Sequence, residues 1–343
     1  MYSYYLRNAI RRRKMKFSVL VPRKIAQAGI DYLENNGCTV DVQQEMTTDE
    51  LKGSIQHYDA VVLRTNIINS EIIANATKLK IIARYGVGLD NIDIEAATNR
   101  GIYVTNTPTA NINSVAEHVV GLILSISRQI NKADRAVRDG DYSIRNSLPG
   151  TELKGKILGI LGLGNIGKLV AEKCALGFGM RVIAYDPYID QPMIDYISIE
   201  NDLERLIKQA DFISLHLPYN TSNHHLFNKE KIGWIKPSAF LINAARGGLV
   251  DEEVLATALK EKSIAGAALD VFEQEPPCLN HSLWELDNII VTPHIAALTN
   301  EAMNEMSLDC AKEIIRIKNK EKPHFWVNKQ EMTEKSSRRK AFK

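Results

Sequence analysis

The clearest structural signal in the chain is the segment "KILGILGLGNIGKLVAEKCALGFGMRVIAYD", residues 156–186. It begins with an apolar run typical of a buried β-strand, passes through a G-x-G-x-x-G turn at Gly162, Gly164 and Gly167 into a helical segment, and ends in a second apolar run. A glycine turn between a strand and a helix directs the first N–H groups of the helix at an anion. This order of elements therefore predicts a βαβ unit that binds a pyrophosphate.

An acidic residue closes the stretch. Asp186 stands at the end of the second run, about 20 residues beyond the glycines, where a carboxylate accepts hydrogen bonds from the ribose hydroxyls of a dinucleotide. The same carboxylate repels a 2′-phosphate. We therefore expect NAD, rather than NADP, as the cofactor.

Further strand-like runs lie on both sides of this unit. Those before it are "FSVLVP", "DAVVLR", "KIIARY" and "IYVTNTP", and those after it are "FISLHL", "AFLINA", "IAGAALD" and "NIIVTP". The runs are apolar on both sides of the pleat, as in parallel strands covered by helices on both faces. Their alternation with helical stretches predicts the α/β class, with two doubly wound, Rossmann-like domains that each hold a parallel sheet.

Two long helical patterns connect these domains. Residues 113–140 have apolar side chains at helical spacing and no proline, which predicts one helix that ends at Gly140. Ser114 and Glu117 have the spacing of a capping box at its start. A second helical pattern over residues 299–320 can return the chain to the first domain.

Composition narrows the classes of function. The chain has 343 residues, 45% of them apolar, and a net charge of only +2. The basic cluster before residue 15 carries more positive charge than this, so the rest of the chain is net negative. We therefore expect no nucleic-acid or membrane partner. The four cysteines are scattered and no histidine, cysteine or carboxylate cluster has ligand spacing, so we expect no metal, no disulfide framework and a cytoplasmic location.

Three polar residues follow predicted strands, where ligands gather in open α/β sheets. They are Arg246 in "NAARGGLVDE", Glu275 in "DVFEQEP" and His294 in "TPHIAALT". With "GILGLGNIGK", these motifs have the order and approximate spacing of one family. From about Val19 to Lys320 the chain resembles the D-isomer-specific 2-hydroxyacid dehydrogenases, most closely their D-3-phosphoglycerate dehydrogenase branch.

The resemblance implies that these three residues form a catalytic triad. Oxidation of a 2-hydroxy acid needs a base at the hydroxyl and a cation at the carboxylate while C2 gives a hydride to the nicotinamide. His294 suits the first task because imidazole titrates near neutral pH. Glu275 would fix the tautomer of His294, and Arg246 would hold the substrate through its guanidinium fork.

The resemblance also implies binding roles. Residues assigned to the cofactor are Gly162, Gly164, Asn165, Ile166, Gly167, Asp186, His216, Pro218, Ala244 and Asp270. In the first domain the loop "ARYGVGLDNID" resembles the substrate loop of the family, with the amides of Val87 and Gly88 on the carboxylate. Arg64 and Arg84 would bind a phosphate bidentately. We assign the remaining histidines, including His118, to surface or packing positions.

The implied organisation has four parts. They are a disordered leader (residues 1–15), a flavodoxin-like substrate-binding domain (16–110 and 296–330), a NAD-binding Rossmann domain with a dimerisation helix and arm (111–295), and a basic tail (331–343). We expect a homodimer with the active site in the cleft between the domains. The chain ends soon after its last long helix, so we expect a short form without a C-terminal regulatory domain.

The reaction class leaves the substrate open. The favoured pair is 3-phosphoglycerate and 3-phosphohydroxypyruvate, the first step of serine biosynthesis. The close alternative is reduction of hydroxypyruvate, glyoxylate or another 2-keto acid. The third hypothesis, from a different class, is a nonenzymatic, NAD-sensing scaffold like the corepressors that share this fold; an intact triad disfavours it.

Overall fold

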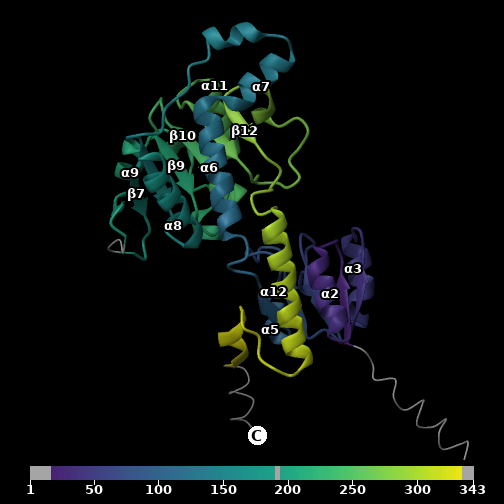
Figure 1. Cartoon of the computed structure of the whole chain (residues 1–343). Coiled ribbons are helices and arrows are strands. Elements are labelled where there is room, and N and C mark those ends of the chain that lie inside the picture. Colours follow the sequence, from purple (N-terminus) through teal and green to yellow (C-terminus); the bar gives the residue numbers. More distant parts are fainter. Residues whose placement is uncertain (1–16, 190–193, 334–343) are drawn as a thin grey trace, which may run out of the picture. The chain divides into compact units, whose positions relative to one another are not determined.

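The computed structural model describes residues 17–189 and 194–333 (Figure 1). The expected leader and nearly all of the basic tail lie outside these ranges. The chain divides into two compact units: unit 1 is Met1–Asn111 with Thr299–Lys343, and unit 2 is Ile112–Leu298. In the described part of the chain, no helix combines the length and apolar character that a membrane span requires.

Unit 1 is built on a five-stranded parallel sheet with the order β2-β1-β3-β4-β5. Its strands are β1 (Phe17–Val21), β2 (Cys38–Val42), β3 (Ala60–Leu63), β4 (Ile81–Arg84) and β5 (Tyr103–Thr105). Its helices are α2 (Gln27–Asn35), α3 (Thr48–Ser54), α4 (Ser70–Asn75), α5 (Ile94–Asn99) and α12 (Asn300–Lys318). Helices α2 and α12 bury one face of the sheet, and α3, α4 and α5 bury the other. Successive residues of β1, Val19 and Leu20, accordingly point into different cores.

Unit 2 is built on a seven-stranded sheet, also parallel, with the order β12-β11-β10-β9-β6-β7-β8. Its strands are β6 (Ile157–Leu161), β7 (Arg181–Tyr185), β8 (Ile197–Ile199), β9 (Phe212–Leu215), β10 (Phe240–Asn243), β11 (Gly266–Leu269) and β12 (Ile289–Val291). Its helices are α6 (Ile112–Arg128), α7 (Ile130–Arg138), α8 (Asn165–Glu172), α9 (Leu203–Gln209), α10 (Lys229–Ile232) and α11 (Glu252–Lys260). The predicted pair of parallel α/β sheets is thus confirmed.

The strand order of unit 2 explains where a ligand can bind. The chain order reverses between the neighbouring strands β6 and β9, so the loops that follow these two strands leave the same edge of the sheet and diverge. Doubly wound sheets bind ligands at such a switch point. The glycine turn follows β6, and His216 follows β9.

Two strands were not predicted from the sequence. Strand β2 and strand β8 lie at the ends of their sheets, and each has only one fully buried residue. Both are partly solvated, and their sequences, "CTVDV" and "ISI", lack the longer apolar run that identified the other strands, including the edge strands β5 and β12.

The prediction of one helix over residues 113–140 was wrong in two respects. The helix begins at Ile112, which places Ser114 inside the first turn rather than at the N-cap. It is also interrupted at Gln129, whose φ is 52°, so that α6 and α7 are separate helices. Thr151 N–H donates to Ser127 O, and Gln129 Nε2 donates to Pro149 O. The returning chain therefore takes a carbonyl that a continuous helix would have used.

Candidate active site

The glycine turn has the geometry of an anion cradle. A Cβ atom on Gly162, where φ is 93°, would lie 2.5 Å from His216 O, and one on Gly167 would lie 2.1 Å from Gly162 O. These two glycines are required by close backbone packing. A Cβ atom on Gly164 would meet no atom within 4 Å, so this glycine borders open space.

Helix α8 begins at this open space. Gly164 is its N-cap, and no side chain among the described residues caps it. The first N–H groups of α8, at Asn165 and Ile166, are therefore available to an external acceptor. A pyrophosphate fits this donor set, and a Cβ atom at Gly164 would occupy its approach.

Asp186 lies beside the same turn. One carboxylate oxygen, Oδ2, accepts a hydrogen bond from Leu163 N–H at 2.9 Å, and Oδ1 accepts one from Tyr188 N–H at 3.0 Å. These bonds fix the carboxylate next to the glycine turn, and each oxygen retains a lone pair for a further donor. The arrangement suits a ribose whose hydroxyl groups donate to Asp186.

Three further predicted cofactor residues of unit 2 follow strands β9 and β10. A hydrogen bond of 2.9 Å joins His216 Nε2 to Ser214 Oγ, and burial lowers the pKa of His216 to about 4. The imidazole is therefore neutral near neutral pH. Pro218 is exposed, and its carbonyl accepts a hydrogen bond from Asn223. Ala244 is half-buried and directly follows β10.

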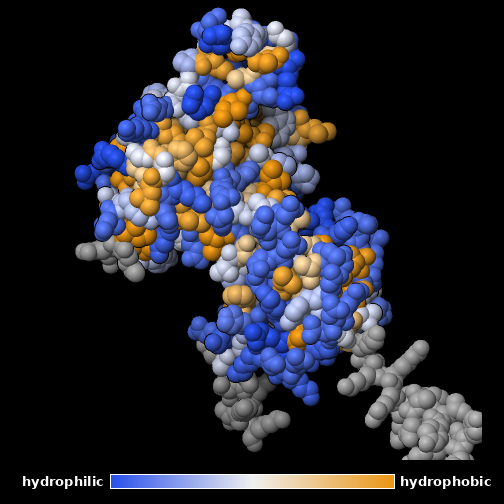
Figure 2. Space-filling model, in the orientation of Figure 1, coloured by the Kyte–Doolittle hydropathy of each residue, from blue (hydrophilic) through white to orange (hydrophobic). Residues whose placement is uncertain are grey.

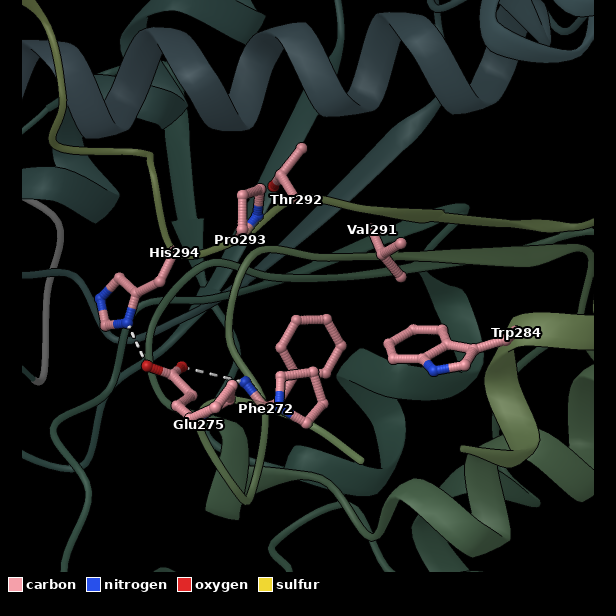
Figure 3. Close-up of a pocket in the computed structure, with 9 residues that line it drawn as sticks. Phe272, Glu275, Trp284, Val291, Thr292, Pro293 and His294 are labelled. Atoms are coloured by element: carbon pink, nitrogen blue, oxygen red, sulfur yellow. Dashed lines mark hydrogen bonds and ion pairs between the residues drawn. The ribbon is translucent and has the colours of Figure 1, made fainter. Parts of the chain in front are cut away.

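The structure brings Glu275 and His294 into direct contact (Figure 3). Glu275 Oε2 lies 2.7 Å from His294 Nδ1, and Glu275 Oε1 accepts a hydrogen bond from Phe272 N–H at 3.1 Å. Burial opposes ionisation of Glu275, but the hydrogen bonds and the charges of His294 and Arg246 outweigh it and lower the pKa of the carboxyl. An ionised Glu275 holds the proton of His294 on Nδ1 and leaves Nε2 able to accept one.

Arg246 is held by residues that the sequence did not single out. Asn243 is buried at the end of β10, and its Nδ2 donates to Arg246 O at 2.9 Å. A Cβ atom on Gly247 would lie 1.9 Å from the Phe272 carbonyl carbon. This backbone contact holds the Arg246 loop against the loop that bears Glu275. A polar residue in the apolar run "FLIN" and the glycine after Arg246 were the available signals.

A pocket of about 300 Å³ lies next to the Glu275–His294 pair (Figure 3). Its walls are mainly apolar, and its polar members are Glu275, Thr292 and His294. The apolar lining residues are Phe272, Pro276, Pro277, Trp284, Val291 and Pro293. Glu275 and His294 line this cavity, and their side chains remain 38% and 48% exposed to solvent.

Asp270 is fully buried at the end of β11. Its Oδ1 accepts hydrogen bonds from Thr292 Oγ1 and Ile295 N–H, and its Oδ2 accepts one from Ala296 N–H. These contacts bind the loop that carries His294. The expected contact of Asp270 with the nicotinamide amide stays a prediction.

The predicted substrate residues all belong to unit 1. Strands β3 and β4 are neighbours, with Leu63 opposite Arg84, so Arg64 and Arg84 leave adjacent strand ends. The Arg64 guanidinium lies 6.0 Å from the centroid of the Tyr85 ring, and Arg84 Nη1 donates to Tyr85 O. A Cβ atom on Gly86, where φ is 132°, would lie 2.7 Å from Arg84 Nη1, so this glycine makes room for the arginine.

The loop after Gly86 presents the other two predicted residues. Val87 is exposed, and Asn106 Nδ2 donates to its carbonyl at 2.9 Å. Neither Val87 nor Gly88 donates a backbone hydrogen bond to any residue that the structure describes. Their N–H groups are therefore suited to bind a carboxylate.

Comparisons with known proteins agree with these features. Residues 120–296 match the family model described as the NAD binding domain of D-isomer specific 2-hydroxyacid dehydrogenases. A D-3-phosphoglycerate dehydrogenase of Archaeoglobus fulgidus is 41% identical over 301 residues, which are 87% of this chain and 57% of the relative. The chain thus spans little more than half the length of that relative.

Two other proteins are covered almost from end to end. A glyoxylate reductase of Thermofilum pendens is 41% identical over 324 residues, which are 91% of this chain and 94% of the relative. The crystal structure of a Thermus thermophilus protein matches with a TM-score of 0.86 at 33% identity, covering 90% of this chain and 99% of that one. The chain therefore belongs to the D-isomer specific 2-hydroxyacid dehydrogenase family, and residues 120–296 form its NAD binding domain.

Proposed function

We propose that the protein is a NAD-dependent dehydrogenase that interconverts 3-phosphoglycerate and 3-phosphohydroxypyruvate. The observation that carries the phosphorylated substrate is the pair Arg64 and Arg84 at neighbouring strand ends, with Gly86 leaving space for the second guanidinium. Two guanidinium groups match the charge and geometry of a phosphate. The name of the Archaeoglobus relative supports the same choice.

The residues of unit 2 supply the chemistry at C2. Asp186 and the N-terminus of α8 would hold the ribose and pyrophosphate of NAD, which when bound would supply the hydride acceptor for C2. His294 Nε2 takes the proton of the C2 hydroxyl because Nδ1 is already bonded to Glu275. Arg246 neutralises the carboxylate of the substrate and orients it. In the reverse direction the protonated His294 returns its proton to the carbonyl oxygen.

A second candidate is reduction of hydroxypyruvate or glyoxylate. The glyoxylate reductase of Thermofilum pendens, which this chain covers over 94% of its length, favours it. The same triad serves both candidates, so only the residues that meet the far end of the substrate discriminate between them. A nonenzymatic NAD-sensing scaffold is disfavoured because the Glu275–His294 pair is assembled.

The experiment that separates these candidates uses Arg84→Ala. We expect kcat/KM for 3-phosphohydroxypyruvate to fall about 10- to 100-fold, because a lost charge-assisted hydrogen bond costs roughly 1.5–3 kcal/mol. The value for hydroxypyruvate should stay within about threefold. Both are measured by the consumption of NADH, with the unit 1 variant Arg100→Ala as the control for loss of an arginine.

Two other results would each support one of the alternative functions. Preference of the wild type for an unphosphorylated acid, unchanged in Arg84→Ala, would establish the second candidate. Binding of NAD without turnover of any 2-hydroxy or 2-keto acid would establish the scaffold.

We also propose a cytoplasmic homodimer. The segment α7 and η2 (Tyr142–Asn146) extends from the rest of unit 2 in Figure 1. No residue of α7 is buried, although Ile130 and Val137 are apolar and each is 52% exposed. Figure 2 shows apolar side chains on the face of unit 2 where α6 and α7 lie. A second copy of the chain would cover this surface.

A further inference from the structure

His294 lies in a strained loop. Its φ is 52°, in the left-handed region that costs a residue with a side chain roughly 1–2 kcal/mol. Such a conformation persists only where the surrounding structure enforces it. The residue that accepts the substrate proton in the proposed function is therefore held by specific contacts.

Those contacts converge on Asp270. The N–H of His294 donates to the backbone oxygen of Asp270 at 2.8 Å. The next two N–H groups, of Ile295 and Ala296, donate to the two carboxylate oxygens of Asp270, both at 2.9 Å. Three consecutive amides thus end on one buried residue. The backbone of Asp270 thus binds His294 itself, and its carboxylate binds the two residues that follow His294 in the loop.

A relay from helix α6 fixes the carboxylate in turn. Thr292 Oγ1 donates its only proton to Asp270 Oδ1 at 2.6 Å. In its hydrogen bond with His118 Nε2, 3.2 Å away, Thr292 Oγ1 must therefore be the acceptor and His118 the donor. His118 Nε2 also lies 3.5 Å from Asp270 Oδ1. In Figure 3 Thr292 points away from the side of the loop on which Glu275 lies. The relay is therefore separate from the Glu275–His294 hydrogen bond.

We propose that His118 and Thr292 are positioning residues for His294, acting through Asp270. Neither needs to touch the substrate. His118 donates to Thr292, Thr292 donates to Asp270, and Asp270 binds three amides of the loop, so that His294 Nδ1 meets Glu275 and Nε2 meets the C2 hydroxyl. The inference gives a role to His118, which the sequence analysis assigned to a surface or packing position, and it rests on the proposed function for its kinetic consequence.

The kinetic test removes one donor at a time. In Thr292→Val and in His118→Phe we expect kcat to fall roughly 10- to 100-fold, because small displacements of a catalytic group are costly, while KM stays within about threefold. Thr292→Ser and His118→Gln restore a donor at the same position and should recover most of kcat. Thr98→Val is the matched control: it removes a buried hydroxyl from unit 1, and its kcat should equal that of the wild type.

A second readout does not depend on turnover. The proton between His294 Nδ1 and Glu275 should give a downfield NMR resonance in protein with 15N-labelled histidine, identified by its loss in Glu275→Gln. Thr292→Val and His118→Phe should shift or broaden it, and Thr98→Val should leave it unchanged. An inactive wild type with this pattern would refute the proposed function alone. Unchanged kcat and resonance in both relay variants would overturn the inference.

Discussion

At the scale of single residues, Glu275 determines what His294 can do. Its ionised carboxylate receives the Nδ1 proton, and a neutral amide in its place can also donate, which would stabilise the wrong tautomer. We expect Glu275→Gln to lower kcat by about 100-fold or more. Because the pKa of Glu275 is lowered, its protonation should limit the wild-type rate only at a pH below the ordinary titration range of a glutamate carboxyl.

The measurement is kcat and kcat/KM as a function of pH for wild type and variant. Glu273→Gln is the matched control, since it removes another carboxylate of the same loop, one that contacts Glu252 N–H and His225, and leaves the His294 hydrogen bond in place. A Glu275→Gln enzyme within twofold of the wild type, or one no slower than Glu273→Gln, would contradict the role of Glu275.

A second residue, Asp59, governs acid stability rather than activity. It is buried in unit 1 between Lys78 and Lys80, at 2.8 and 3.0 Å. Burial opposes its ionisation, but hydrogen bonds from these lysines and Ser18 outweigh this and lower its pKa to about 2. A depressed pKa in the folded state adds stability above the unfolded-state value, and that stability is lost as the pH falls through about 2.

Asp59→Asn should therefore reduce the free energy of unfolding by about 2 kcal/mol near neutral pH. The difference from the wild type should shrink as the pH is lowered from about 4 to about 2. Urea unfolding at several pH values measures both effects, with Asp31→Asn, an exposed carboxylate, as the control. A difference that is constant over this pH range would show that Asp59 acts through packing instead.

At the scale of elements, the central strands and the glycine turn were predictable because their signals are local. A buried parallel strand needs a continuous apolar run, and a phosphate-binding turn needs glycines at fixed offsets. Strands β2 and β8 escaped prediction because the sequences "CTVDV" and "ISI" contain no long apolar run. The break at Gln129 depends on the return of residues 149–151, which helical periodicity does not record.

In the candidate site, too, residues marked by local sequence signals were predictable, and residues that depend on distant contacts were not. Glu275 and His294 could be placed together because they follow the neighbouring strands β11 and β12. Asn243 and Gly247, which hold the Arg246 loop, depend on contacts with residues distant in sequence. His118 is further still from its partners: it lies on α6, 174 residues before Thr292. Spacing within a motif cannot report such a contact, and the apolar helix around His118 concealed it.

At the level of the whole molecule, the arm of unit 2, which consists of α7 and η2, has apolar side chains that a single chain leaves exposed. Helix α7 has nine residues, and a helix of this length is marginal in water without packing. Ile130, Ala133 and Val137 follow the i, i+3, i+7 spacing of one helix face, and Tyr142 beyond it is 69% exposed. In the proposed homodimer this face packs on the second copy.

Introducing charged side chains on the apolar face of α7 should dissociate the proposed homodimer. We expect the wild type to sediment with twice the mass of one chain, and Ile130→Glu combined with Val137→Glu to shift it to the mass of one chain, because burying two carboxylates is costly. The matched control, Lys132→Glu with Arg135→Glu, changes the charge of the same helix off its apolar stripe and should leave the mass unchanged. A wild type with the mass of one chain, or an Ile130→Glu/Val137→Glu variant that keeps twice that mass, would refute α7 as the interface. If the variant with the mass of one chain also loses kcat while its unit 2 remains folded, the second copy is needed for catalysis as well as for covering the arm.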